Sequence, residues 1–335
     1  MKIKQEIPIF FSADDNYIPC LAVAIYSLIK NTSKENNYRI IVLQMGISEE
    51  NKSKIKEFET ENVKINFEDV SSRVTKIKKD LALRLRDYYS STIYYRLFIP
   101  SLFPEYEKAI YLDSDIIVLD DIAKMFNIDL KENYVAAIPD GAVSVNPDFQ
   151  KYVKQAVGVE YKKYFNSGVL LMNLREFRKS RFEEKFLYML TKYNLDTVAP
   201  DQDYLNMLCN GKVYYLDETW DKMPDFGKRY DEKDLHIIHY NFFRKPWHYA
   251  DVPYSDAFWK YAKETKFYST LQEELANYTD EQRKIDTEKA NSLNGRTREI
   301  CREELKLVDI IEEADDVVEN KNNDSCLREL YNQFI

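Results

Sequence analysis

The chain has 335 residues, of which 44% are hydrophobic and 14% aromatic, enough apolar material for one large globular domain or two smaller ones. Its formal net charge of −9 argues against a nucleic-acid partner, because contacts with phosphate backbones need an excess of lysine and arginine. Four scattered cysteines form no CxxC pair, and no signal peptide or membrane-length apolar run is present, so we expect a cytoplasmic protein without a transmembrane segment.

Strands and helices alternate in the first seventy or so residues. Apolar runs predict the strands, and periodic or capped polar segments predict the helices between them. The strands are expected over 7–11, 39–45 and 63–70, and the helices from Pro19 to Lys30 and over 48–61. This alternation is typical of a mostly parallel α/β sheet that is flanked by helices.

The rest of the chain continues the pattern and then changes character. Strands are predicted over 108–112, 134–138, 168–173 and 235–240, with a long helix over 176–192. From about Thr279 the sequence is highly charged and has almost no aromatic residues. We therefore predict one catalytic domain over 1–278 and a charged helical tail over 279–335, of the kind that usually exposes a solvated face.

Glycine-rich phosphate loops are missing from this sequence. Its seven glycines form no GxGxxG pattern, and Val213 follows the Gly211-Lys212 pair where a P-loop has Ser or Thr. A bound nucleotide diphosphate would therefore need another partner for its charge, and a divalent cation held by carboxylates is the obvious candidate.

Asp113 and Asp115 are the best candidates for such carboxylates. They follow the predicted strand over 108–112, at the edge where open α/β sheets bind their ligands. Because residues two apart in extended chain point to the same face, both side chains can share one ion. The alternative is a solvated turn after the strand. The neighbouring Asp120-Asp121 pair is better explained as the cap of the next helix.

A histidine could complete this metal site. His236 and His239 lie in the predicted strand over 235–240, and their odd separation places them on opposite faces, so we expect only one of them, His239, to reach the ion. Imidazole with two carboxylates suits Mn²⁺ better than Mg²⁺, which remains the alternative ion. The competing interpretation is a histidine with satisfied hydrogen bonds in the core.

Several short motifs, taken in order, resemble glycosyltransferase family 8, which includes bacterial lipopolysaccharide galactosyl- and glucosyltransferases and glycogenin. The resemblance spans roughly Ile7 to Trp247 and implies a single GT-A-like domain with a helical C-terminal extension. Its motifs are Ser12-Ala-Asp-Asp-Asn-Tyr17, Tyr111-Leu-Asp-Ser-Asp115, Phe165-Asn-Ser-Gly-Val-Leu-Leu-Met-Asn-Leu174, Asp201-Gln-Asp203, His239-Tyr and Lys245-Pro-Trp247.

The resemblance implies a donor site for a UDP-sugar. Asp14 would accept the uracil N–H, Asn16 would contact the nucleoside and Tyr17 would stack on the base, although a helix cap also explains this loop. Mn²⁺ held by Asp113, Asp115 and His239 would meet the diphosphate, with Lys245 as a second positive group. The implied donor-binding set is Ala13, Asp14, Asn16, Tyr17, Arg96, Asp113, Ser114, Asp115, Asn166 and Lys245.

The resemblance also implies the catalytic residues. Arg96, Asn166, Asp201 and Gln202 would hold the donor sugar, and Asp140 would lie near a carbohydrate acceptor. The alternatives are a structural salt bridge for Arg96 and a turn before a strand for Asn166.

The reaction would be hexosyl transfer with retention of configuration. Because a glutamine amide is a poor nucleophile, both a double displacement and attack on the leaving group's own face stay open. Two other functions are a metal-dependent nucleotidyltransferase and a nucleotide-sugar binder without turnover. Membrane contact is not supported by the acidic tail.

Overall fold

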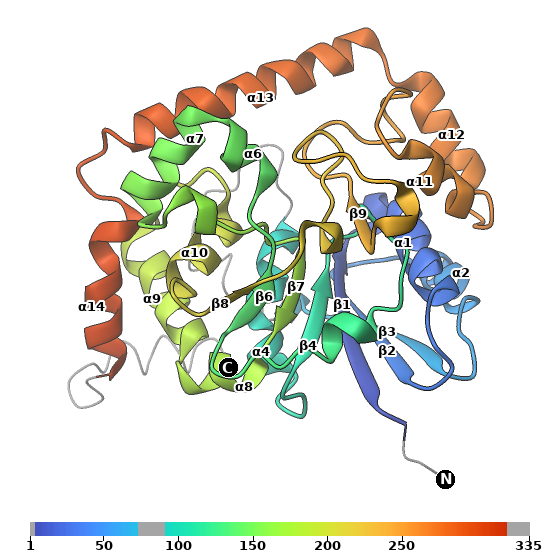
Figure 1. The fold of residues 1–335 in the computed structure, drawn as a ribbon, viewed down its shortest axis with the longest axis horizontal. Helices are drawn as coiled ribbons and strands as arrows, with labels where there is room; N and C mark the ends of the chain where they lie inside the picture. Colours follow the sequence, from blue (N-terminus) through green and yellow to red (C-terminus); the bar gives the residue numbers. More distant parts are fainter. Residues whose placement is uncertain (1–3, 73–90, 320–335) are drawn as a thin grey trace.

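A computed structural model describes residues 4–72 and 91–319. Its centre is a seven-stranded sheet with the order β3-β2-β1-β4-β7-β6-β8 (Figure 1). Neighbouring strands are parallel except on both sides of β7, which is antiparallel to β4 and to β6. The strands are β1 (Glu6–Ala13), β2 (Asn37–Gln44), β3 (Val63–Asp69), β4 (Ala109–Leu112), β6 (Val135–Ala137), β7 (Val169–Met172) and β8 (Val213–Tyr215). The predicted mostly parallel α/β sheet is confirmed.

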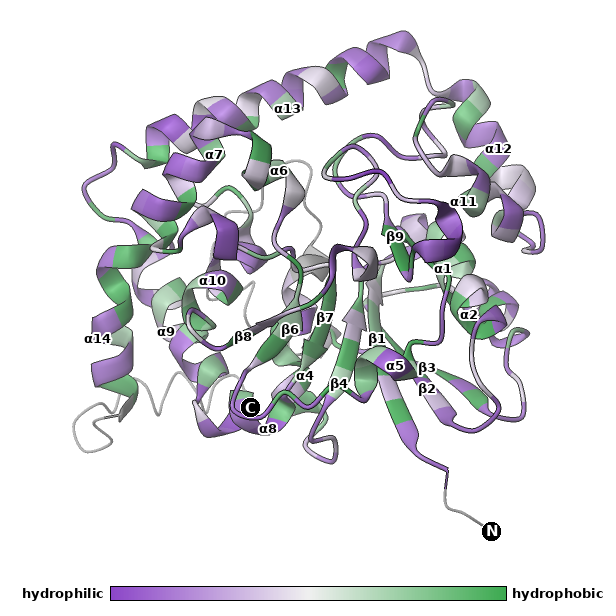
Figure 2. Cartoon of the chain, in the orientation of Figure 1, coloured by the Kyte–Doolittle hydropathy of each residue, from purple (hydrophilic) through white to green (hydrophobic). Residues whose placement is uncertain are grey.

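Helices cover both faces of this sheet, and its central strands β4, β6 and β7 are accordingly buried and apolar on both faces (Figure 2). In β1, Ile9 and Phe11 pack into one core cluster, whereas Phe10 between them packs into the other. The helices are α1 (Ile18–Lys30), α2 (Glu49–Lys56), α4 (Ile99–Leu102), α5 (Ala123–Phe126), α6 (Gly141–Val145), α7 (Pro147–Tyr152), α8 (Leu174–Lys179), α9 (Phe182–Tyr193), α10 (Pro200–Leu208), α11 (Ser255–Ala262), α12 (Tyr268–Asn277), α13 (Asp280–Ile300) and α14 (Leu307–Glu319). Within the described ranges, none of them has the length and apolar character of a bilayer span.

A two-stranded ribbon lies outside the central sheet. It pairs β5 (Ile116–Val118) with β9 (Ile237–His239) in antiparallel orientation, so that Ile116 faces His239. The strand predicted over 235–240 thus exists in shortened form, but its partner strand was not predicted. The ribbon matters for the site because it ties His239 to the residue that directly follows Asp115.

Two predicted helices differ from the observed ones. The helix expected over 176–192 is in fact α8 and α9, and the break falls at Arg181, whose φ of 55° is in the left-handed region. Asn173 caps α8, which therefore starts two residues earlier than the charged pattern suggested. The helix expected over 48–61 begins after its Ser48 cap but ends at Lys56.

The described part of the predicted tail is helical and packs on the domain. The Thr279 and Gln282 side chains form a capping box that starts α13, which runs from α12 across α7 to the α14 side of the molecule (Figure 1). Leu293, Ile300 and Ile310 of these helices are buried in the same core cluster as β4 and β7. The helices therefore contribute more than a solvated face, while residues 320–335 lie outside the described part of the chain.

We expect Ile310→Ala to destabilise the whole domain by about 2–5 kcal/mol, because Ile310 is 1% exposed and its truncation leaves a cavity between α14 and the core. Urea unfolding would measure the loss. The matched variant Glu312→Ala, at an exposed position of the same helix, should change the stability by less than about 0.5 kcal/mol. Equal stability of the two variants would show that α14 is only loosely attached.

Candidate active site

All the residues predicted for the site line one cavity of about 610 Å³, a volume typical of small-molecule sites. The cavity opens at the carboxyl ends of β1 and β4, where parallel sheets bind their ligands. The predicted residues on its wall are Ala13, Asp14, Asn16, Tyr17, Arg96, Asp113, Ser114, Asp115, Asp140, Asn166, Asp201, Gln202, His239 and Lys245.

The loop after β1 forms the first side of the cavity. Asp14 Oδ1 accepts hydrogen bonds from the backbone N–H groups of Asn16 and Tyr17 at 3.1 and 3.2 Å, so the alternative interpretation of Asp14 as a cap is correct for this oxygen. The Tyr17 side chain meets Trp247 edge to face and is 39% exposed at the cavity wall. An aromatic ring is therefore presented where a flat ligand could stack on it.

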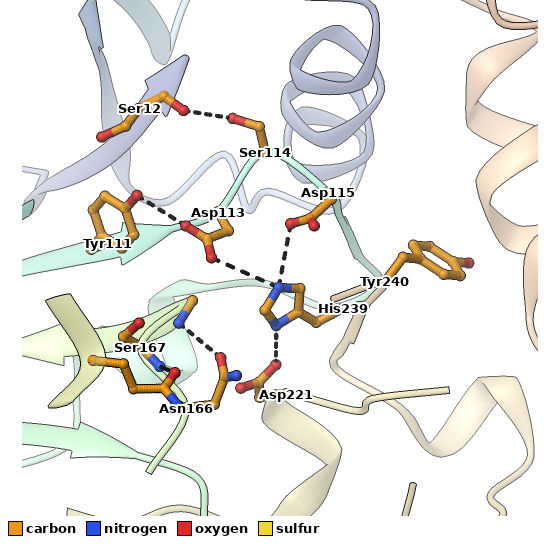
Figure 3. Close-up of polar contacts among 12 residues, drawn as sticks. Ser12, Tyr111, Asp113, Ser114, Asp115, Asn166, Ser167, Asp221, His239 and Tyr240 are labelled. Carbon is orange, nitrogen blue, oxygen red and sulfur yellow. Dashed lines mark hydrogen bonds and ion pairs between the residues drawn. The ribbon is translucent and has the colours of Figure 1, made fainter. Parts of the chain in front are cut away.

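Asp113, Asp115 and His239 converge on the wall of the cavity (Figure 3). One ligand atom from each side chain lies within 4.8 Å of the others. His239 Nε2 is 3.3 Å from Asp115 Oδ1 and 3.8 Å from Asp113 Oδ2. This set of two carboxylates and one imidazole is one that first-row divalent ions accept. The role of the three residues as metal ligands stays a prediction.

His236 lies elsewhere, as its parity in the strand predicted. Its Nδ1 is 2.7 Å from Asp120 Oδ2, and its ring stacks on Trp220 with centroids 4.1 Å apart. Asp121, the neighbour of Asp120, accepts a hydrogen bond from the Ala123 N–H at the start of α5. Both aspartates therefore serve local structure, and neither lines the cavity.

Asp221 orients the imidazole from behind, and sequence reasoning missed it. Its Oδ1 lies 2.9 Å from His239 Nδ1, and its side chain is buried, so Nδ1 is the donor and Nε2 faces the two aspartates. Burial alone would lower the pKa of His239, but the carboxylates of Asp221 and Asp115 outweigh it and raise this pKa to about 10. A cation at Nε2 would have to displace this proton.

We expect Asp221→Ala to weaken the binding of Mn²⁺ by about 10–100-fold, because the imidazole loses its orienting partner. Asp221→Asn retains an acceptor oxygen and should recover part of this loss. Mn²⁺ titration followed by calorimetry would measure both, and Asp231→Asn, at an exposed ion pair with Lys233, is the control. Unchanged affinity in Asp221→Ala would contradict the orienting role.

Arg96 connects the metal-ligand candidates to the catalytic ones. Its Nη2 is 2.9 Å from Asp113 Oδ1 and its Nε is 3.2 Å from Asp201 Oδ2, while the guanidinium lies over the Tyr111 ring. The side chain is only 4% exposed. Burial raises the pKa of Asp201, and the positive charge of Arg96 partly offsets this increase. The structural salt bridge proposed as the alternative therefore exists, and it holds two predicted site residues in place.

Asp140, Asn166 and Gln202 form a hydrogen-bonded group beside this network. Asp140 Oδ2 accepts from Gln202 Nε2 at 3.0 Å and from Asn166 Nδ2 at 3.2 Å. Asp140 Oδ1 caps α6, and Gln202 Oε1 accepts the Ser167 N–H at 2.9 Å. The amide of Gln202 is thus fixed at both ends, which fits a residue that positions a ligand.

Lys245 is the second buried cation of the cavity. Its ammonium group forms an ion pair with Asp115 and also donates to the Tyr240 carbonyl. Burial alone would raise the pKa of Asp115, but Lys245 and His239 outweigh it and hold that pKa well below its usual range. Asp115 is therefore kept ionised, as a metal ligand must be.

Two further residues escaped sequence reasoning. A Cβ atom on Gly168 would lie 2.3 Å from His239 Cε1 and 2.6 Å from Asp113 Oδ2, so the triad can close only around a glycine. The cavity wall also includes Asn241, whose buried Nδ2 has no hydrogen-bond partner among the described residues. The Phe165-Asn-Ser-Gly motif marked the region of Gly168, but nothing in it specified a contact with His239.

This sheet, with a nucleotide-sized cavity at its carboxyl edge, is that of a GT-A glycosyltransferase, as comparison with solved structures confirms. The galactosyltransferase LgtC, solved with donor and acceptor sugar analogs, is 26% identical with a TM-score of 0.64, and the match covers 78% of this chain and 96% of LgtC. The bifunctional glycosyltransferase WbbM shares the fold with a TM-score of 0.70 at 23% identity, over 83% of this chain and 53% of WbbM.

The family model of glycosyl transferase family 8 matches residues 8–251, so the chain belongs to this family, as its motifs indicated. A putative glycosyltransferase of Haemophilus influenzae is 33% identical over 253 residues, 73% of this chain and 74% of that protein. A lipopolysaccharide 1,2-glucosyltransferase of Escherichia coli is 26% identical over 271 residues, 75% of this chain and 77% of the enzyme.

Proposed function

We propose that this glycosyltransferase moves a hexose, glucose or galactose, from a UDP-sugar to a saccharide acceptor, with retention of configuration and with Mn²⁺. The observation that carries the proposal is the convergence of Asp113, Asp115 and His239 within 4.8 Å on the cavity wall. The named relatives that transfer glucose or galactose support a hexose as the transferred group.

The residues fit a divalent ion at this point. Gly168 leaves room for the three side chains to meet, Asp221 fixes the imidazole, and Lys245 keeps Asp115 ionised. The mixed nitrogen and oxygen donor set favours Mn²⁺ over Mg²⁺. When bound, the ion would supply Lewis-acid stabilisation of the departing diphosphate.

The chain's own side chains would then bind and orient the donor. Tyr17 at the cavity wall would stack on the base, and Lys245 would add positive charge beside the phosphates. Asp201 and Asn166 would form hydrogen bonds with the hydroxyl groups of the sugar. Arg96 fixes the orientation of the Asp201 side chain, and Asp140 fixes that of Asn166. These contacts would place the anomeric carbon near Gln202.

The contacts of Gln202 bear on how retention is achieved. Its oxygen already accepts the Ser167 N–H, and its nitrogen donates to Asp140, so the group is a fixed neutral amide. An amide of this kind is a weak nucleophile. We therefore favour attack by the acceptor hydroxyl on the face that the diphosphate leaves, with Gln202 as a positioning residue.

A donor screen tests the proposal. Purified protein is incubated with UDP-glucose or UDP-galactose and Mn²⁺, and UDP release is measured without an acceptor and with methyl glucoside or glucose 6-phosphate as acceptor. NMR of the product's anomeric proton reports retention. A nucleotidyltransferase would instead release pyrophosphate from UTP and a sugar 1-phosphate, and a pure binder would bind UDP without any turnover. Either of these results would replace the proposed function.

A further inference from the structure

Helix α13 runs from α12 across α7 (Figure 1), and its residues Asp286, Lys289 and Leu293 line the cavity. Near its start, Asp286 Oδ2 accepts hydrogen bonds from the hydroxyls of Tyr249 and Tyr278 at 2.9 and 2.7 Å. Near its end, Asn294 Oδ1 accepts from Asn146 Nδ2 at 2.7 Å, at the cap of α7. The helix is thus anchored on both sides of the cavity, and its middle turns form part of the cavity wall.

The inward face of α13 changes character along its length. The face follows the helical spacing of three and four residues. Toward the end it is apolar or small, with buried Leu293, Thr297 and Ile300, two of which belong to the core cluster. Over the cavity the same face carries Asp286 and Lys289. Charged residues therefore share the cavity-facing part of this face with Leu293, which also belongs to the core cluster.

Lys289 differs from the other cations that line the cavity. Arg96 is paired with Asp113 and Asp201, and Lys245 is paired with Asp115. Lys289 is half-buried, and within residues 4–72 and 91–319 its ammonium group forms neither an ion pair nor a hydrogen bond. A partly desolvated cation without a direct ion-pair partner is a ready site for a ligand's anion.

This cation lies outside the segment that the family model matches. The family model ends at residue 251, whereas α13 begins at Asp280. The residues predicted to meet the donor diphosphate, including Lys245, all precede residue 251. Because the donor residues are already assigned to the matched segment, the part of the cavity beside α13 is left for the acceptor.

We propose that α13 forms a wall of the acceptor site and that Lys289 binds an anionic group, a phosphate or a carboxylate, on the acceptor saccharide. This inference rests on the proposed function, because it assumes that a sugar donor occupies the other half of the cavity. Asp286 anchors α13 through its two tyrosine partners, and Lys289, one turn later, supplies the positive charge. The acceptor is then a negatively charged glycan.

Binding of three small probes tests the charge preference. Methyl glucoside, glucose 6-phosphate and methyl glucuronide are titrated by NMR against the wild type, against Lys289→Gln and against Lys284→Gln, an exposed control on the same helix. Titrations are run with Mn²⁺ and UDP and again without them. We expect at least one anionic probe to bind the wild type about tenfold more tightly than methyl glucoside.

Lys289→Gln should abolish this preference and leave UDP affinity unchanged, whereas Lys284→Gln should keep both. The probe that is preferred identifies phosphate or carboxylate as the anion. Equal binding of all three probes to the wild type, or a preference that survives in Lys289→Gln, would overturn the proposal, as would a loss of UDP affinity in that variant. Failure of the proposed function shows separately in the donor screen, as pyrophosphate release or as UDP binding without turnover.

Discussion

Asp115→Asn is expected to reduce sugar transfer by at least about 100-fold while the fold survives, because the substitution keeps the side-chain shape but removes the charge that a divalent ion needs. Asp115 is held in place by both its side chain and its backbone. It faces His239 Nε2 at 3.3 Å and forms an ion pair with Lys245, and its backbone carbonyl accepts the Tyr240 N–H. The loss of sugar transfer should therefore reflect the missing charge and not a displaced side chain.

The measurement compares UDP release by the wild type, Asp115→Asn and the exposed control Asp129→Asn in EDTA, Mn²⁺ and Mg²⁺. The wild type should be inactive in EDTA, and more active with Mn²⁺ than with Mg²⁺ if the imidazole is a ligand. Asp129→Asn should match the wild type, since Asp129 only caps an exposed turn. Full activity in EDTA, or an Asp115→Asn variant as active as the wild type, would refute the metal-assisted mechanism.

Local periodicity was enough to predict much of this site. Asp113 and Asp115 are two residues apart at a strand end, and His239 was preferred to His236 from the alternation of a strand alone. Both inferences depend only on the geometry of one extended segment. The structure brings these three side chains together and leaves His236 on Trp220, outside the cavity.

Contacts between distant segments were beyond such reasoning. Asp221 lies 18 residues before His239, and no spacing rule links a residue in one loop to the unseen face of an imidazole in a later strand. The ribbon of β5 and β9 joins segments even farther apart. The charged composition of α13 did not indicate that one face of the helix is buried, because composition over a whole segment averages the exposed and the buried side. Family resemblance supplied roles for residues but no account of this helix.

Gly168 carries the second large prediction. In Gly168→Ala the new methyl group would have to occupy space within 2.3 Å of His239 Cε1 and 2.6 Å of Asp113 Oδ2. The backbone cannot easily move away, because the Gly168 carbonyl accepts the Asp113 N–H at 2.7 Å and its own N–H donates to Asn166 at 2.8 Å. The two side chains must therefore separate, and the triad opens.

We expect Gly168→Ala to lower the affinity for Mn²⁺ by at least about 10–100-fold and to destabilise the fold by about 1–3 kcal/mol through overpacking. Calorimetric titration and urea unfolding would measure the two effects. Gly295→Ala is the matched control: nothing lies within 4 Å of its added Cβ, and this position inside α13 should gain up to about 1 kcal/mol of stability.

The double variant Gly168→Ala/His239→Ala separates displacement of the ligand from general damage. If the methyl group acts by displacing His239, the histidine's removal should cost little further affinity for Mn²⁺ in this background, whereas His239→Ala alone should cost much. Additive losses would mean that Gly168→Ala leaves His239 in place and acts through Asp113 alone. Wild-type affinity in Gly168→Ala would mean that the three side chains do not meet around Gly168 when the ion binds.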